Sequence, residues 1–463
     1  MKSDIRILAV EPYLSLEKAR EPLKFGAVVV EDGVYCHVRV RVENRAGQVA
    51  DGWGAIWLMD FWAFPSKVVP HELRLKAFRR LNADFCRIAA GYTEFGHPIA
   101  IMTELEKALP DLKRRISQEM ALVEEIPMLG ALVCASPVDA ALHDAFGMVN
   151  GIDSYSGYTA DWMDHDLSRY LGPAFAGQYP GDYMRPAFVP ELPAFHLVGG
   201  LDILRRADVP PTAPRDGLPN SLEDWVRRDG LICLKVKLKG TDLAWDLERT
   251  IEVVRIAREA RVEIGADPDA LRFSADTNEQ CEHPQYIVDY LHRLRELDPF
   301  AFDHLLYVEQ PTERDLRAHC YDMRPIAALK PVIIDESLTS LEDFDLAMEL
   351  GWSGIALKTC KGHSNALIFA AKAAAAGIPY TIQDLTNPGI SLLHSVGLAA
   401  RLYPLMGVEA NSPQFFPATS RPEETVHPNI FNRRGGMVRI SSLRGPGLGY
   451  RIAEIPRRIF HQT

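Results

Sequence analysis

A regular alternation of short apolar runs and amphipathic segments after about residue 195 most constrains the fold of this chain. The runs have strand character and are FHLV from Phe195, ICLKVK from Ile232, RFSAD from Arg272, LLYVEQ from Leu305, VIIDES from Val332, GIALK from Gly354, YTIQD from Tyr380 and GVEA from Gly407. Segments of helical length separate most of them, at 242–260, 285–297, 341–350, 365–376 and 389–402. This repetition predicts an α/β fold, a parallel (β/α)₈-type barrel. An open doubly wound sheet is the alternative, because periodicity alone does not exclude it.

The 463 residues exceed one ordinary hydrophobic core, so we expect additions to the barrel. Residues 1–150 mix strand and helix patterns: a hairpin within 25–42 that turns at Glu31-Asp32-Gly33, and helices around 70–90, 103–123 and 137–149. Glycine, tyrosine and proline then dominate 153–220, a loop long enough to be functional or disordered.

Composition narrows the functional classes. Lysine plus arginine total 51 against 62 acidic residues, a net charge of −11, which disfavours nucleic acid as a partner. No apolar run reaches the roughly 18 residues of a membrane helix, and the first residues carry no signal-peptide pattern. Seven scattered cysteines with no CxxC pair suit reduced, mostly buried thiols. We therefore expect a cytoplasmic protein without membrane or nucleic-acid partners.

Charged residues stand at or near the carboxyl ends of seven consecutive predicted strands, where burial is costly unless they bind something. They are Lys235, Lys237, Asp276, Glu309, Asp335, Lys358, Asp384 and Glu409. In a barrel this rim is where catalytic groups converge.

Three of these residues, Asp276, Glu309 and Asp335, offer carboxylates on adjacent strands. Hard divalent cations such as Mg²⁺ prefer oxygen ligands of this kind. The alternative is a charge-balanced rim in which the three carboxylates are ion-paired with lysines. We predict the metal site, with Mg²⁺ as the ion and Mn²⁺ as a substitute.

Three lysines are the candidate acid–base groups. Lys235 and Lys237 are two residues apart on a strand, so their side chains share a face, and mutual repulsion is expected to lower their pKa values. Lys358 lies four strands away and would approach a central ligand from the opposite side. Solvated or salt-bridged side chains are the alternative interpretation.

These segments resemble a known family. CLKVKLKG, SADTNEQ, YVEQP, IIDES and IALKTCKG, with ASPVDAALHDAFG from Ala135 and RGPGLGYRIAE from Arg444, resemble the motif series of the enolase superfamily, in its muconate-lactonizing branch. The resemblance implies a modified TIM barrel, (β/α)₇β, with an α+β capping domain. It divides the chain into a capping domain (1–150), a linker or lid insertion (151–194), a barrel (195–415) and a C-terminal segment that returns to the cap (416–463).

The resemblance also implies roles. Asp276, Glu309 and Asp335 would hold Mg²⁺, and Lys237 and Lys358 would exchange a proton on opposite faces of the carbon α to a substrate carboxylate, through an enediolate. Lys235 would assist electrostatically. The expected activity is racemisation or epimerisation, with β-elimination or muconate-type cycloisomerisation as alternatives. A small-molecule carboxylate is the expected partner, and homo-oligomers are common among such enzymes.

Departures from the family pattern bear on the substrate. Ala55 stands where the family often has glutamate, and Gln383-Asp384 stands where the mandelate-racemase branch has histidine. Asp384, Glu409 and Asn411 are candidate substrate contacts, and acidic residues there would suit an ammonium group. It is equally consistent with the sequence that these residues do not touch the substrate and instead hold neighbouring site residues or form ion pairs.

Other classes fit less well. GHSNA from Gly362 approaches the G-x-S-x-G elbow of serine hydrolases but ends in alanine. Schiff-base chemistry on a lysine would leave three carboxylates unexplained. A non-catalytic binding protein on this scaffold would be expected to have lost some of the site residues. The three carboxylates and the three lysines of the predicted site are all present.

Overall fold

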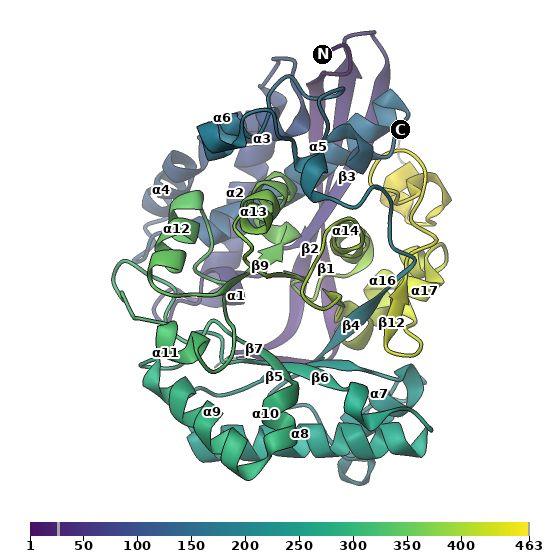
Figure 1. Cartoon of the computed structure of the whole chain (residues 1–463). Coiled ribbons are helices and arrows are strands. Elements are labelled where there is room, and N and C mark those ends of the chain that lie inside the picture. Colours follow the sequence, from purple (N-terminus) through teal and green to yellow (C-terminus); the bar gives the residue numbers. More distant parts are fainter. Residues whose placement is uncertain (26–27, 462–463) are drawn as a thin grey trace.

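The computed structural model describes residues 1–25 and 28–461. Its N-terminal part, called the cap below, is a three-stranded antiparallel sheet in the order β1-β2-β3, packed against helices (Figure 1). The cap elements are β1 (Ile5–Phe25), β2 (Val28–Asn44), β3 (Val49–Trp57), α1 (Asp60–Ala63), α2 (His71–Ala90), α3 (Pro98–Glu106), α4 (Leu109–Glu119) and α5 (Met128–Asn150).

The predicted turn at Glu31-Asp32-Gly33 is wrong. The register pairs Lys18 with Asp32 and Leu23 with Val30, so the three residues lie within β2. Gly33 is needed for packing instead, because a Cβ there would lie 1.7 Å from the indole of Trp57. The part of the predicted hairpin at 26–27 lies outside the described residues.

The helices of the cap also differ in extent from the sequence prediction. The single helix expected over 103–123 is two helices, α3 and α4, and Pro110 stands in the first turn of α4. The helix expected from Pro137 begins nine residues earlier, at Met128, and continues through that proline.

Helix α5 is long and apolar enough to span a membrane by length and composition, a feature the sequence analysis did not identify. In this structure 94% of its most apolar window is buried inside the protein. Gly52 and Gly54 of β3 allow the close contact, since a Cβ at either would lie 2.1 Å from a backbone atom of α5. It is the core helix of the cap.

The barrel prediction is confirmed. In the described part of the chain eight parallel strands run in chain order from β4 to β11, and β11 pairs with β4 to close the ring. The strands are β4 (Glu191–Val198), β5 (Cys233–Lys237), β6 (Arg272–Asp276), β7 (Leu305–Glu309), β8 (Val332–Ile334), β9 (Gly354–Lys358), β10 (Tyr380–Gln383) and β11 (Val408–Glu409). The alternative of an open sheet is excluded.

Helices surround the barrel and connect its strands (Figure 1). They are α7 (Leu222–Asp229), α8 (Leu243–Glu263), α9 (Gln285–Leu297), α10 (Pro299–His304), α11 (Arg324–Ala327), α12 (Leu341–Glu349), α13 (His363–Ala375) and α14 (Gly389–Arg401). Residues 151–190, between the cap and the barrel, form short turns and α6 (Ser168–Leu171). The last strand, β12 (Met437–Arg439), follows the barrel and pairs antiparallel with β4. The segment between β11 and β12 holds α15 (Ser412–Phe415), α16 (Pro417–Glu424) and α17 (Pro428–Phe431).

The C-terminal segment packs against the cap sheet. Phe460 contacts Trp53 edge-on, with ring centroids 4.8 Å apart, and Thr419 Oγ1 donates to Glu17 at 2.8 Å. The cap is also tied to the barrel, because Tyr35 OH donates to the carbonyl of Pro388 at 2.5 Å. These contacts hold the cap over the carboxyl ends of the barrel strands.

Candidate functional site

The carboxyl ends of the barrel strands open into a small cavity of about 40 Å³, which the cap covers. Its walls combine barrel residues Leu197, Lys235, Lys237, Asn278, Lys358, Asp384, Leu385, Thr386 and Glu409 with cap residues Leu23, Met59 and Trp62. All three predicted lysines therefore line one cavity.

The lysines of β5 share a face of that strand, as predicted. Lys237 Nζ donates to Asp276 Oδ2 at 2.5 Å, and Lys235 Nζ lies 3.2 Å from the same oxygen. Lys358 of β9, four strands further around the barrel, donates to Asp335 Oδ2 at 2.7 Å. The ammonium groups thus flank the cavity from two sides.

The three predicted carboxylates occupy neighbouring strand ends and are fully buried. Asp276 is the register partner of Glu309, and Asp335 follows β8 directly. Each is ion-paired, which is the alternative that the sequence left open: Glu309 accepts from Lys235 at 2.7 Å. Over residues 1–25 and 28–461, no three carboxylate, thiol or imidazole groups are gathered around one point as a metal would require.

The chemistry of the donor set nevertheless fits a hard divalent cation. Burial raises the pKa of Glu309, the Lys235 ammonium opposes this shift, and the nearby charges of Asp276 and Asp335 add to it. Beside this group, Glu336 Oε2 and Asn278 Oδ1 are buried oxygens without a hydrogen-bond partner. Clustered, partly unsatisfied oxygens are the ligands that Mg²⁺ prefers, although reaching them would require the ion pairs to rearrange.

The expectation of a lowered pKa for Lys235 is wrong. Burial lowers the pKa of this ammonium, but Glu309, Glu409 and Asp276 outweigh burial and raise it well above the usual value. Lys358 behaves similarly: burial acts against the charge, and Asp335 raises its pKa. Repulsion between the β5 lysines is a smaller effect than attraction to three carboxylates.

Two further residues contribute to the site and were missed. Trp62 of α1 covers the cavity, with its Nε1 donating to Glu336 Oε1 at 2.9 Å and its ring 4.5 Å from Lys358 Nζ. Lys361 Nζ lies 3.0 Å from Asp335 Oδ1, so this carboxylate contacts two ammonium groups. The second lysine of the segment IALKTCKG was the available signal for Lys361. No sequence pattern marks Trp62, because its position depends on how the cap docks.

The structure separates the three candidate substrate contacts. Asp384 and Glu409 line the cavity, whereas Asn411 does not. Asn411 Nδ2 donates to Glu409 Oε1 at 2.6 Å, and its Oδ1 accepts from Leu197 N, so it orients a strand end. Burial raises the pKa of Asp384 to about 8, and the charge of Glu409 adds to the effect.

Ser364, the residue behind the serine-hydrolase alternative, lies in a buried polar network between α5 and α13. Its Oγ donates to Asp139 Oδ1 at 2.7 Å and is 2.9 Å from His143 Nε2. The Ser364 side chain is buried and does not line the cavity at the strand ends. The position gives no access to a substrate.

The cysteine prediction is confirmed. All seven thiols are free, and only Cys320 is exposed.

Comparisons with known proteins agree with the fold. A family model described as Enolase C-terminal domain-like matches residues 218–455, which is more than half of the chain. The N-succinylamino acid racemase of Thermus thermophilus is 31% identical over 193 residues, covering 40% of this chain and 46% of that protein. The match thus spans about half the length of this curated relative.

Two solved structures resemble the whole chain in fold. The L-Ala-D/L-Glu epimerase from Bacillus subtilis has a TM-score of 0.61 at 17% identity, over 96% of this chain and 98% of that one. The dipeptide epimerase from Cytophaga hutchinsonii, complexed with Mg and the dipeptide D-Ala-L-Val, has a TM-score of 0.56 at 17% identity, over 89% and 88%. Together with the family match and the capped barrel, these findings show that the chain belongs to the enolase superfamily, in the family described as Enolase C-terminal domain-like.

Proposed function

We propose that this protein removes and returns the proton α to a substrate carboxylate in a Mg²⁺-dependent reaction, and that it is a racemase or epimerase. The observation that carries the proposal is the pair of lysine positions, Lys237 and Lys358, at two sides of one cavity beside three buried carboxylates. A planar carbanion that can be reprotonated from either face is what inversion of configuration requires.

Asp276, Glu309 and Asp335 would hold the metal ion. A divalent cation supplies positive charge near the substrate carboxylate, which stabilises the second negative charge that develops when the α-proton leaves.

The chain's own groups move the proton. In one direction Lys237, as a neutral amine, takes the α-proton while Lys358, as an ammonium, delivers one to the opposite face. In the reverse direction the roles exchange. The raised pKa of Lys358 favours its ammonium form, which is the form that donates in the first direction.

The remaining groups set the electrostatics of the site. Lys235, whose pKa is also raised, stays an ammonium next to Glu309 and contributes fixed positive charge. Trp62 and Met59 cover the cavity and exclude water from the carbanion.

The relatives favour amino-acid derivatives as the substrate class. One relative is named as an N-succinylamino acid racemase, one structural neighbour as an L-Ala-D/L-Glu epimerase and another as a dipeptide epimerase. Asp384 and Glu409 would then face a distal ammonium or amide of the substrate. β-elimination and cycloisomerisation use the same lysines and are the alternative outcomes.

A chiral product assay tests the proposal. N-succinyl amino acids, dipeptides and muconate are incubated with the protein and Mg²⁺, and products are separated on a chiral column. Formation of the opposite configuration supports racemisation or epimerisation. A product with a new double bond or ring would replace this proposal with one of the alternatives.

A further inference from the structure

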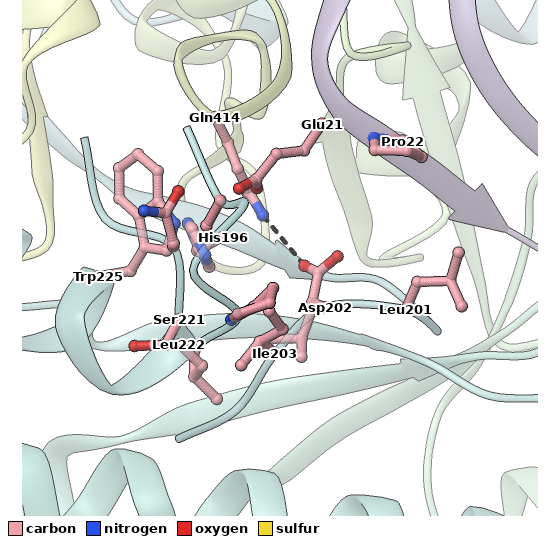
Figure 2. A pocket seen from close by; sticks show the side chains of 14 residues that line it. Glu21, Pro22, His196, Leu201, Asp202, Ile203, Ser221, Leu222, Trp225 and Gln414 are labelled. Atoms are coloured by element: carbon pink, nitrogen blue, oxygen red, sulfur yellow. Dashed lines mark hydrogen bonds between the residues drawn. The ribbon is translucent and has the colours of Figure 1, made fainter. Parts of the chain in front are cut away.

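A second cavity, of about 200 Å³, lies on the outer face of strand β4 (Figure 2). Side chains alternate along this strand, so Leu197 faces the proton-transfer cavity while His196 and Val198 line the outer one. The other walls come from the cap strand β1, the loop after β4, the start of α7 and Gln414. They are Glu21, Pro22, Leu201, Asp202, Ile203, Pro210, Ala213, Asn220, Ser221, Leu222, Trp225 and Gln414.

The charged residues that line this cavity are both acidic, Glu21 and Asp202. Asp202 is held in place, because its Oδ2 accepts from Gly199 N at 2.9 Å and from Gln414 Nε2 at 3.1 Å. Figure 2 shows the Glu21 and Asp202 side chains extending toward the same space. Burial raises the pKa of Glu21, Arg20 opposes this shift, and the charge of Asp202 adds to it, so a cation between the two carboxylates would relieve repulsion.

The neighbouring arginines neutralise this acidic pair only in part. Arg20 Nη1 lies 3.1 Å from Glu21, but its other nitrogens bind Asp216. Arg249 donates to the backbone carbonyls of Gly199 and Asp202 rather than to a carboxylate. Neither arginine lines the cavity.

Two buried polar atoms in the cavity wall have no hydrogen-bond partner. They are His196 Nδ1 and Gln414 Oε1, on residues that are 1% and 3% exposed. Burial lowers the pKa of His196 well below its usual value, and Arg433 and Arg228 act in the same direction, so the imidazole is neutral. Leaving such atoms unpaired is costly, and a ligand carrying N–H groups would supply the missing hydrogen bonds.

The lining therefore offers hydrogen-bond acceptors, negative charge and apolar walls together. Primary ammonium and guanidinium groups carry several N–H donors and no acceptor. Pro22, Val198, Leu201 and Ile203 suit an attached aliphatic chain.

We propose that the outer cavity is a second binding site, distinct from the proton-transfer site, for a small aliphatic amine or guanidine whose cation pairs with Glu21 and Asp202. Glu21-Pro22 line the outer cavity and the next residue, Leu23, lines the inner one, so the ligand also holds the cap strand against β4.

The test uses n-butylamine and n-butylguanidine as probes and n-pentanol as the neutral control, with binding followed by saturation-transfer NMR and calorimetry on the full chain. The wild type should bind both cations and not the alcohol. Glu21→Gln and Asp202→Asn should each weaken binding by about tenfold or more. Glu191→Gln, an exposed acid of β4 paired with Arg439, should leave binding unchanged.

A substitution in the other cavity separates this site from the proposed reaction. Lys237→Ala should bind the probes as tightly as the wild type, even if no proton-transfer activity is ever found. The proposal is overturned if the wild type does not bind the cations. Equal binding by Glu21→Gln and wild type overturns it too, as does loss of binding in Lys237→Ala. Because Glu21 is only half-buried, Glu21→Gln tests the proposal even if Asp202→Asn fails to fold.

Discussion

Trp62 of the cap lies over the ammonium group of Lys358 in the barrel, with the Nζ 4.5 Å from the ring centroid. The same indole donates a hydrogen bond to Glu336, the residue after Asp335. The proposed acid–base group on β9 is therefore positioned by a residue from a different part of the chain, so the site is complete only when the cap is docked.

Replacing Trp62 should slow the reaction without unfolding the protein. Cation–π contacts are worth about 0.5–2 kcal/mol, so Trp62→Leu should reduce α-proton exchange by about 2- to 30-fold. Trp62→Phe keeps a ring over Lys358 and should lose less. An equal loss in both variants would assign the effect to the hydrogen bond with Glu336 instead.

Lys237 and Lys358, two of the three lysines that line the cavity, should have separate roles. Lys237→Ala should abolish α-proton exchange from one configuration of the substrate, and Lys358→Ala from the other, because each lysine removes the proton from one face of the α-carbon. Circular dichroism checks the fold, and Lys372→Ala, on α13 and paired with Asp345, is the matched control. A mild and equal loss for both configurations in Lys237→Ala would move the base elsewhere.

Removing divalent metal should abolish the activity and lower the thermal midpoint, because Asp276, Glu309 and Asp335 then lose a common counter-charge. Added Mg²⁺ should restore both. The measurement is a thermal melt and a turnover assay, each with chelator and with excess Mg²⁺. Full turnover in chelator would contradict the metal assignment and leave the carboxylates as ion-pair partners of the lysines.

Ser364→Ala should reduce stability and leave turnover unchanged. The substitution removes a buried hydroxyl that bonds both Asp139 Oδ1 and His143 Nε2, and leaves these two groups only their contact with each other at 3.3 Å, at a cost of about 1–3 kcal/mol. Chemical unfolding measures the first effect and the chiral assay the second. Loss of turnover in a folded Ser364→Ala protein would reopen the hydrolase alternative.

Stability should fall as the pH drops below about 6.5, partly through His427. Burial lowers the pKa of this imidazole to about 4, although its bond to the Tyr450 carbonyl opposes the shift. The folded pKa is below the unfolded one, so the stabilisation is complete above the unfolded pKa. It is lost by about 1.4 kcal/mol per pH unit as the pH falls toward the folded pKa. His427→Gln should show a shallower decline in the unfolding midpoint between these values, and an unchanged slope would contradict the assignment.

The sequence predicted the barrel well for a physical reason. Parallel strands are buried on both faces, so each leaves a compact apolar run, and Lys235, Asp276 and Lys358 are conspicuous at the ends of such runs. The eight runs coincide with the strands β4 to β11. The roles of these residues stay predictions, as does the expected homo-oligomer.

Contacts between segments that are distant in the sequence could not be predicted from it. The turn assigned to Glu31-Asp32-Gly33 failed because the glycine is required by Trp57, which is far along the chain. Trp62 and the outer cavity around His196 depend on docking of the cap, and the charge of Lys235 depends on carboxylates from three other strands. None of these relationships has a local signature.

The most direct test of the central claim is α-proton exchange followed by proton NMR in heavy water. The protein is mixed with Mg²⁺ and the panel of N-succinyl amino acids, dipeptides and muconate, and the α-proton signal is followed over time. The account predicts loss of this signal for at least one carboxylate, dependent on Mg²⁺ and absent for one configuration in Lys237→Ala. Exchange that persists without metal, or that is unaffected in both Lys237→Ala and Lys358→Ala, would contradict it.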